Sequence, residues 1–454
     1  MKLRKFLLTT LIFAILNMSS HIALGQSLPV LRDSEIETIL RQWSDPIFKA
    51  ANLNPASVTI RLIEDSRLNA FVGGGQNIFL HSGLLIASDN PLQVIGVIAH
   101  ETGHIAGGHL ARSEEASRQA QTIALLHTLL GVGAAAVGSV VGATGSSEVG
   151  SALLSSGGAT GMRHFLAFTR TQESAADQAA ISFLEENKIS ARGLLGFLQK
   201  FENQDLLTPN RQDPYMRTHP LTKERIAFVK EHVENSEFSS GIISNSELAK
   251  HARIRAKLIG FLQPVGQTFR RYPADDLSVA ARYARAIAHY KDSNLEYALS
   301  DLDSLILEHS TDPYFHELRG QFLFESGRLE EAWTSYELAN QLLPNDVLLM
   351  IELARLEIEM GGGELLDKAI GSLEKVSILE PRNNVCWWLL SIGYGRAGYL
   401  ADSSLASAEQ ALLEGRPEDA VLHADRAIRG LENGSPRWLR ANDVKHVAIR
   451  RSGQ

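Results

Sequence analysis

The chain is 454 residues long and carries 44 lysines and arginines against 52 aspartates and glutamates, a formal net charge of −8. A chain of this length holds about two or three domains. Its residues are 44% hydrophobic and 21% charged, which excludes a disordered chain and is ordinary for a globular protein. The acidic balance argues against a nucleic-acid partner, because nucleic-acid-binding proteins carry basic surfaces.

The N-terminus has the features of an export signal. Basic residues near the start precede an apolar run at residues 6–18, and a small-x-small site follows at residues 23–25. This order predicts a secretory signal peptide over residues 1–25. An uncleaved membrane anchor is the alternative, which is less favoured because the apolar run is short for a membrane span. Cys386 is the only cysteine, so no internal disulfide can form, and for an exported protein this favours the periplasm.

Short regular elements follow the signal. Residues 33–52 have the apolar spacing of an amphipathic helix, and the stretches 58–63, 69–72 and 77–81 have the composition of strands. Pro91 stands at a favoured first-turn position of the next helix. We expect the strand at 77–81 to present its edge to an extended peptide, which would add to the sheet as a further strand.

The helix that begins near Pro91 contains the run His100-Glu101-Thr102-Gly103-His104. Residues four apart share one face of a helix, so the two imidazoles can bind one zinc ion. Glu101 lies one step around the helix, where its carboxylate can hold and deprotonate a metal-bound water. A catalytic zinc usually has three protein ligands, so a third must come from elsewhere in the chain.

The extended pattern HExxHxxGxxH does not supply that third ligand. Gly107 fits the pattern, but Leu110 stands where the third histidine belongs. His109 stands one position before the place of that third histidine. On a continuing helix its side chain would point more than about 100° away from that of His104. We therefore expect His109 to be a packing or surface residue.

Residues 123–143 contain no charged side chain and are rich in Gly and Ala. The run is long enough to span a membrane, but its glycines and His127 make it only weakly apolar. We expect the segment 123–163 to form a helical hairpin that is buried or covers the cleft as a lid, with membrane contact as the alternative.

Glu173 is the best candidate for the third ligand. It lies in a predicted helix at 171–187 and has Asp177 four residues further on, so the two carboxylates share one face. Small neighbours allow this helix to pack closely on the HExxH helix, where Asp177 can accept the outward N–H of a ligand histidine. An ordinary acidic helix face is the alternative. Other nearby carboxylates lack reach or rigid support: Glu114, Glu115 and Glu148.

Further helices are expected at 191–203 and 221–234. Residues 235–245 are rich in Ser, Asn and Gly and mark the end of a first domain at 26–235. The segment 236–275 is expected to be a linker and joining helix.

The segment 276–454 has the spacing of tetratricopeptide repeats, a pattern of about 34 residues in which small residues, an aromatic and a proline recur. Stacking such helix pairs buries a continuous core and forms a concave surface that binds protein segments. A non-repeating helical bundle is the alternative. The repeat positions include Gly320, Ala332, Tyr336, Ala339, Pro344, Ala354, Ala369, Pro381, Trp387, Leu390, Tyr394, Gly415, Ala420, Ala424 and Ala427.

As a set, these motifs resemble the HtpX/BepA-type gluzincin zinc metallopeptidases. The resemblance covers about residues 30–235 in the catalytic part and the whole chain in architecture. It is carried by HExxH at 100–104, Arg170-x-x-Glu173-x-x-Ala176-Asp177, Asn69-Ala70-Phe71, Gly83-Leu84-Leu85, and Thr218-His219-Pro220 with Arg225.

The predicted fold is α+β and mainly helical: a zincin-type metalloprotease domain with a small β-sheet, followed by an α-solenoid of tetratricopeptide repeats. The resemblance implies a periplasmic endopeptidase with one zinc per chain, peripheral at the outer membrane. It would degrade misassembled outer-membrane proteins and contact their assembly machinery through the repeats.

The resemblance also implies that His219 caps the zinc as a fourth ligand and restrains activity; the other interpretation is a loop histidine bonded to nearby backbone. Arg225 would support the active-site wall or the developing oxyanion. It could equally pair with Glu224 or another surface acid, which we favour from the sequence.

Two functions from other classes stay open. One is a scaffold or chaperone whose repeats do the work while the metal site is silent or latent. The other is an intramembrane protease that uses residues 123–143 as a span.

Overall fold

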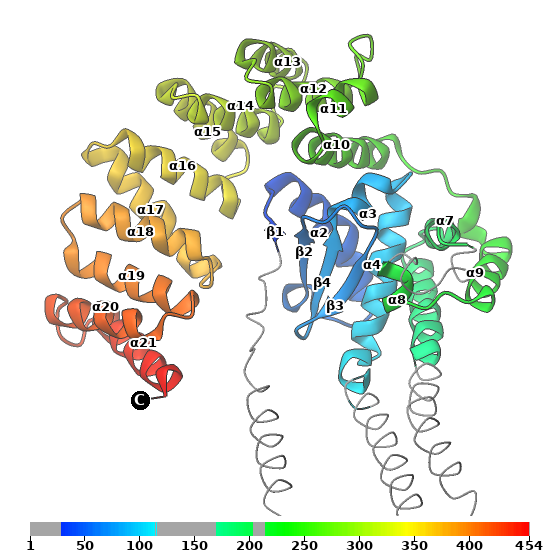
Figure 1. Ribbon diagram of the computed structural model, residues 1–454, viewed down its shortest axis with the longest axis horizontal. Coiled ribbons are helices and arrows are strands. Elements are labelled where there is room, and N and C mark those ends of the chain that lie inside the picture. The colour runs from blue at the N-terminus through cyan, green and yellow to red at the C-terminus, as the bar shows by residue number, and fades with distance from the viewer. Residues whose placement is uncertain (1–28, 114, 116–168, 203–213, 454) are drawn as a thin grey trace, which may run out of the picture.

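The computed structural model describes residues 29–113, 115, 169–202 and 214–453. The predicted signal peptide, the segment 123–163 and the candidates Glu114 and Glu148 lie outside these residues. The described chain folds into a mixed α/β part that is followed by a long arc of helices (Figure 1).

Among its described residues, the first part contains four strands and several helices. One further helix, which Figure 1 draws without a label, runs through residues 169–186. The elements up to the arc are β1 Val30–Leu31, α2 Ser34–Ala50, η1 Pro55–Ser57, β2 Thr59–Ile63, β3 Ala70–Gly73, β4 Asn77–His81, α3 Ser82–Ala87, α4 Pro91–Ala106, α7 Arg192–Gln199, α8 Pro214–Thr218, α9 Lys223–Asn235 and η4 Glu237–Ser240.

The arc consists of helices joined by short turns. They are α10 Asn245–Leu262, α11 Val265–Arg271, α12 Val279–Lys291, α13 Leu295–Glu308, α14 Pro313–Glu325, α15 Leu329–Leu342, α16 Val347–Met360, α17 Gly363–Leu379, α18 Asn384–Arg396, α19 Leu400–Leu413, α20 Pro417–Gly430 and α21 Pro436–Ser452.

The four strands form one sheet in the order β1-β2-β4-β3. β2 runs parallel to β4, while β1 and β3 pair antiparallel with their neighbours. The expectation that strand 77–81 lies at the edge was wrong, because β4 is held between β2 and β3. β3 and β4 form a hairpin whose turn uses Gly74 and Gly75 at positive φ, and β3 lies at one edge of the sheet.

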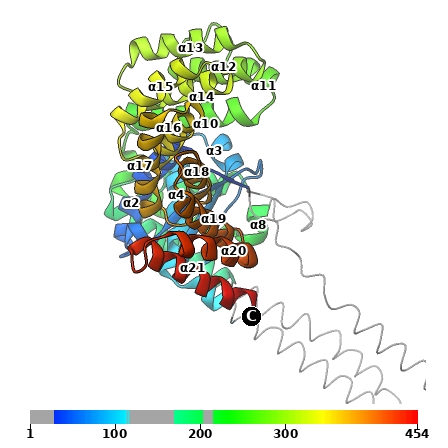
Figure 2. The same ribbon diagram turned by 90° about the vertical axis from the view of Figure 1, so that its left-hand side faces the viewer.

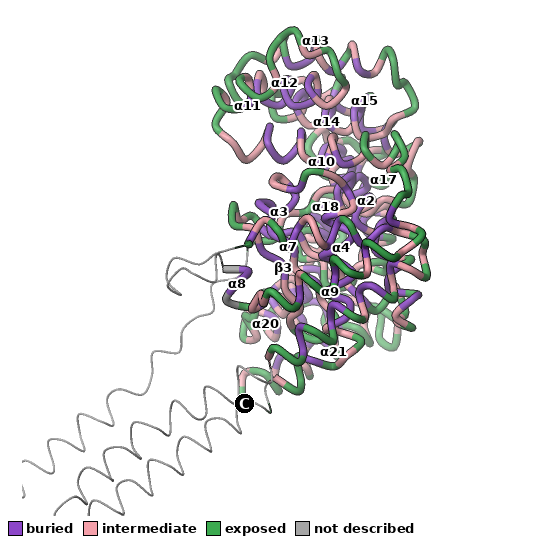
Figure 3. The backbone as a smooth tube through the Cα atoms, turned by 90° about the vertical axis from the view of Figure 1, so that its right-hand side faces the viewer, coloured by how far each residue is buried: buried purple, intermediate pink, exposed green. Residues whose placement is uncertain are grey.

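α4 lies inside the first part, between the sheet and α7 (Figure 1). Its start is fixed by Asn90, whose side chain accepts from the Gln93 N–H, and every residue from Gln93 to Gly103 is buried (Figure 3). Gly96 permits the close approach of α7, since a Cβ there would lie 2.7 Å from the backbone nitrogen of Leu194. α4 is therefore a rigid element, which suits it to hold functional side chains.

The arc of helices has the paired packing expected of the repeats (Figure 2). Gly320 on α14 faces Tyr336 on α15, and a Cβ at Gly320 would lie 2.8 Å from the Tyr336 Cγ. Ala332 and Ala339, which also lie on α15, are fully buried. The small-and-aromatic pattern thus sets the distance between paired helices, as the sequence predicted.

Buried charges join the two parts of the chain. Lys257 on α10 is 3% exposed, and its Nζ lies 2.7 Å from Asp33 Oδ2, 3.5 Å from Glu35 Oε2 and 3.9 Å from Glu317 Oε2. The Tyr283 hydroxyl donates to Glu35 Oε2 at 2.9 Å. Helix α10 therefore contacts the start of α2 through buried ion pairs, α12 contacts it through a hydrogen bond, and α14 adds the Glu317 carboxyl to the same cluster.

This cluster predicts a pH dependence of stability. Burial, together with the charges of Asp33 and Glu35, raises the pKa of Glu317 from 4.5 to about 8, although Lys257 opposes the shift. Between these values the folded chain keeps a proton that the unfolded chain has released, so the free energy of unfolding should fall as pH rises from about 5 to 8.

Urea titrations at several pH values check this expectation. The Glu317→Gln variant should show a flatter profile over this window, because its side chain does not titrate. A variant whose profile runs parallel to that of the wild type would show that Glu317 does not cause the dependence.

Candidate metal centre

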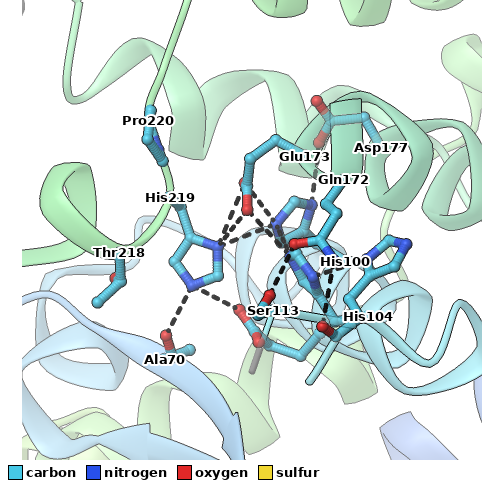
Figure 4. A network of polar contacts seen from close by, with 12 residues as sticks. Ala70, His100, His104, Ser113, Gln172, Glu173, Asp177, Thr218, His219 and Pro220 are labelled. Carbon is cyan, nitrogen blue, oxygen red and sulfur yellow. Dashed lines mark hydrogen bonds and ion pairs between the residues drawn. The ribbon is translucent and has the colours of Figure 1, made fainter. Parts of the chain in front are cut away.

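The HExxH run places three functional side chains on the buried face of α4. The Nε2 atoms of His100 and His104 lie 3.1 Å apart, so both rings point at one spot (Figure 4). His100 is fully buried, and 11% of the His104 side chain is exposed. This is the shared face that the four-residue spacing predicts.

The helix through residues 169–186 brings two carboxylates to the same spot. Glu173 Oε2 lies 3.3 Å from His100 Nε2, and Glu173 Oε1 lies 3.3 Å from His104 Nε2. Asp177 Oδ1 lies 2.9 Å from the other ring nitrogen of His100, Nδ1. His100 is therefore held on both sides, with Nε2 toward the centre of the site and Nδ1 toward Asp177 (Figure 4).

Close packing of two helices makes this convergence possible. Gly103 on α4 faces Ala176 on the second helix, and a Cβ at Gly103 would lie 2.8 Å from the Ala176 carbonyl oxygen. A real Cβ needs more room, so the small residues at the contact set the spacing between His100 and Glu173.

Gly103→Ala should therefore push the two helices apart. We expect a loss of about 1–3 kcal/mol in the free energy of unfolding, the usual cost of overpacking, together with weaker metal binding. Urea unfolding and a metal-binding titration measure the two effects. Gly371→Ala is a matched control, because a Cβ there meets nothing within 4 Å; an equal loss in both variants would contradict the packing argument.

His219 closes the site from a third direction. It directly follows α8, and its ring stacks on Tyr215 with centroids 4.6 Å apart. Its Nδ1 lies 3.3 Å from Glu173 Oε2 and 3.4 Å from His100 Nε2, while Nε2 lies 3.2 Å from the carbonyl oxygen of Ala70 (Figure 4). His219 thus bridges the carboxylate and the edge strand β3.

Arg225 on α9 is also part of the site. It is 3% exposed; its Nε donates to Asp177 Oδ2 at 2.6 Å, and its Nη1 lies 2.9 Å from Glu173 Oε2. Nη1 also donates to the Pro220 carbonyl at 2.9 Å. The interpretation that we favoured from the sequence, a surface pair with Glu224 or another exposed acid, was wrong.

The charges in the site keep both carboxylates ionised. Burial alone would raise their pKa values, but the charge of His219 and hydrogen bonds from His100, His104 and His219 hold the pKa of Glu173 well below its usual range. For Asp177 the charge of Arg225 and hydrogen bonds from Arg225 and His100 likewise lower the pKa. Ionised carboxylates are the form that binds a metal ion.

Four side chains fit a metal ion by geometry and chemistry. His100, His104, Glu173 and His219 each offer one ligand atom, and these atoms all lie within 4.8 Å of one another. Imidazole nitrogens with a carboxylate oxygen form a donor set typical of zinc. Both oxygens of the buried Glu101 carboxylate lack a hydrogen-bond partner among the described residues, so Glu101 is available to a bound water.

Of the two expectations for His109, packing or surface, the structure shows packing. The projection assumed an unbroken helix from His104 to His109, whereas α4 ends at Ala106 and helix resumes only at His109. His109 is 6% exposed, and its Nδ1 lies 3.0 Å from the Nδ1 of His104. His109 is a neighbour of a predicted ligand and not a surface residue.

Residues 31–233 match the family described as Peptidase family M48. The matched segment contains α4, the helix through residues 169–186, His219 and Arg225, so the site described above lies inside the part of this metalloprotease that is similar to M48 peptidases. None of the helices in the described ranges is long and apolar enough to cross a membrane.

The similarity to known proteins extends beyond residues 31–233. The chain is 24% identical over 414 residues to the Beta-barrel assembly-enhancing protease of Escherichia coli strain K12. The aligned region covers 90% of this chain and 82% of that protein. It is 24% identical over 428 residues to the Putative beta-barrel assembly-enhancing protease of Vibrio cholerae, with the same coverage. Metalloprotease LoiP of Escherichia coli strain K12 is 28% identical over 186 residues, or 40% of this chain and 65% of that protein. The similarity to the first two therefore includes the helical repeats.

Proposed function

We propose that the chain is a zinc-dependent endopeptidase in which His100, His104 and Glu173 hold the metal ion. The observation that supports this most strongly is the convergence of ligand atoms from two helices, with the nitrogens of both histidines 3.3 Å from the Glu173 carboxylate. Asp177 fixes the orientation of His100, and Arg225 fixes Asp177.

Zinc bound there would polarise the scissile carbonyl and lower the pKa of an attacking water. Glu101 takes the proton of that water and passes it to the leaving amine. Its carboxylate is fully buried on α4, next to His100. The edge strand β3, whose Phe71 and Val72 line the same pocket as Glu101, offers backbone groups to an extended substrate once His219 leaves the Ala70 carbonyl.

We further propose that His219 occupies a fourth ligand position in the resting enzyme. Its Nδ1 is near both Glu173 and His100, and its Nε2 lies 3.5 Å from Glu101 Oε1. In this position it competes with substrate, both at the metal and at the Ala70 carbonyl of the edge strand.

His219→Ala should therefore increase cleavage of an unfolded protein. We expect a rise of about tenfold in kcat/KM, the equivalent of about 1.4 kcal/mol, with zinc content unchanged. Initial rates on a fluorescently labelled denatured protein measure the effect, and His446→Ala on the exposed face of α21 is the control. A rate at or below that of wild type would contradict the capping role.

The substrate class follows from the relatives. Because two of them are named as β-barrel assembly-enhancing proteases, we propose that this protein acts in the periplasm after export. It degrades misassembled outer-membrane proteins, assists their assembly, and contacts the assembly machinery through the repeats. Similarity over 90% of the chain supports a shared arrangement of protease and repeats.

Metal content and cleavage, measured on the same preparation, test this function. We expect one zinc per chain, cleavage of a denatured protein at internal peptide bonds, loss of cleavage with a chelator and recovery when zinc is added back. A zinc-free or zinc-loaded preparation that binds unfolded protein without cutting it would instead favour the scaffold interpretation, with a silent metal site.

A further inference from the structure

His109 makes a specific contact with a predicted metal ligand. Its Nδ1 lies 3.0 Å from the Nδ1 of His104, and the two rings meet edge to face at 78° with centroids 5.0 Å apart. The contact is almost completely buried, since His109 is only 6% exposed. This contact involves the nitrogen of His104 that points away from Glu173.

Two glycines turn the chain so that this contact can form. α4 ends at Ala106, and Gly108 has φ +63, a conformation that suits glycine and interrupts the helix before it resumes at His109. Gly107 lies under the ring of His109: a Cβ there would be 2.4 Å from the His109 Nε2. The helix end is therefore shaped to return His109 toward His104.

A second set of hydrogen bonds fixes His109 from the neighbouring helix. The Gln172 side chain donates through Nε2 to the His109 carbonyl oxygen at 3.1 Å. Its Oε1 accepts from the Ser113 hydroxyl at 2.9 Å (Figure 4). Gln172 directly precedes Glu173, so the backbone of His109 is tied to the residue next to a predicted ligand.

The direction of the hydrogen bond between the His104 and His109 rings follows from the orientation of His104 toward Glu173. His104 directs Nε2 toward Glu173 and the centre of the site, and a neutral imidazole that uses Nε2 as a ligand carries its proton on Nδ1. The Nδ1–H of His104 therefore donates to His109 Nδ1, which accepts with its lone pair. Histidine ligands usually make such an outward hydrogen bond, and the bond fixes the ring orientation.

We propose that His109 is a positioning residue that orients His104 for zinc, as Asp177 does for His100. The proposal rests on the proposed zinc site. It assigns the two histidine ligands different partners, a carboxylate for His100 and a neutral imidazole for His104. His109 itself does not bind the metal, because its accepting nitrogen faces His104.

Zinc affinity tests the proposal, measured by competition with a chromophoric chelator on the full chain. In His109→Leu the outward N–H of His104 loses its acceptor, and we expect the zinc dissociation constant to rise about 10–100-fold. His109→Asn places an amide oxygen near the position of Nδ1, so we expect a zinc affinity within about threefold of wild type. His232→Leu on α9 is the control, since its ring pairs with Glu185.

The outcomes separate the two claims. If wild type binds no zinc, the proposed function fails together with this inference. If wild type binds one zinc and His109→Leu binds it equally well, only the positioning role is overturned. A loss of zinc affinity in His109→Asn as large as in His109→Leu would also overturn the positioning role, because zinc affinity would then not depend on a hydrogen-bond acceptor at this position. If His109→Leu does not fold, as circular dichroism of the metal-free chain would show, His109→Ala takes its place in the comparison with His109→Asn.

Discussion

Glu101→Gln should strongly reduce peptide cleavage and leave the metal bound. Glutamine has nearly the same shape as glutamate but cannot accept the proton of the attacking water. Because general acid–base catalysis contributes about 10²–10⁴-fold, we expect kcat to fall by about that factor. Glu101 is not among the four side chains whose ligand atoms converge, so zinc content should stay at the wild-type level. Rates on a denatured protein and metal analysis of the same preparation measure both effects.

The control is Glu186→Gln, at an exposed position of the helix that carries Glu173. It makes the same chemical change outside the site and should keep full activity. Full cleavage by Glu101→Gln would show that another group acts as the base. Loss of zinc would show that the glutamate is a ligand, which contradicts the assignment of its role.

Arg225→Met should strongly destabilise the metal-free protein. The guanidinium is buried and pairs with Asp177 at 2.6 Å and with Glu173 at 2.9 Å. Removing one partner of a buried ion pair leaves uncompensated charge and costs about 3–5 kcal/mol. We expect a loss of this size in the free energy of unfolding, together with about 10–100-fold weaker zinc binding as Asp177 loses its orientation.

Urea unfolding of the metal-free full chain measures the loss in stability. Arg426→Met is the matched control, because Arg426 is exposed on α20 and surface substitutions change stability by less than about 0.5 kcal/mol. Arg225→Lys keeps the charge but not the forked geometry and should fall between wild type and Arg225→Met. Equal stability of Arg225→Met and wild type would show that the two carboxylates do not depend on this residue.

The positions of the main site residues were predictable because they depend on local periodicity. The spacing of His100 and His104 places them on one helical face, and the same rule places Glu173 and Asp177 on another. The small residues around Gly103 and Ala176 indicated that these faces could meet. That Glu173, Asp177 and His219 act as ligands or supports is still a prediction, which the proposed zinc measurements address.

Other features depend on geometry that periodicity does not contain. The position of His109 follows from the positive φ of Gly108, and a helix projection assumes that no such turn occurs. The edge position of β3 follows from the β3–β4 hairpin together with the parallel pairing of β2 and β4. Arg225 looks like a surface residue on α9 until the packing of α9 places it on Asp177.

The repeats were predictable in outline for the opposite reason. Their helices pack mainly on neighbours in sequence, so the recurrence of small and aromatic residues such as Gly320 and Tyr336 indicates the contact directly. The buried ion pairs of Lys257 with Asp33 and Glu35 join segments far apart in the chain. No local pattern predicted them.

The central claim is that His100, His104 and Glu173 together hold one zinc ion. X-ray absorption at the zinc edge, measured on the purified full chain and on Glu173→Gln, tests it most directly. The account predicts one zinc per wild-type chain, bound by nitrogen and oxygen ligands at about 2.0–2.2 Å, and a clear loss of zinc in the variant. A wild-type chain without zinc, or a variant with the same zinc content and the same ligand shell, would contradict it.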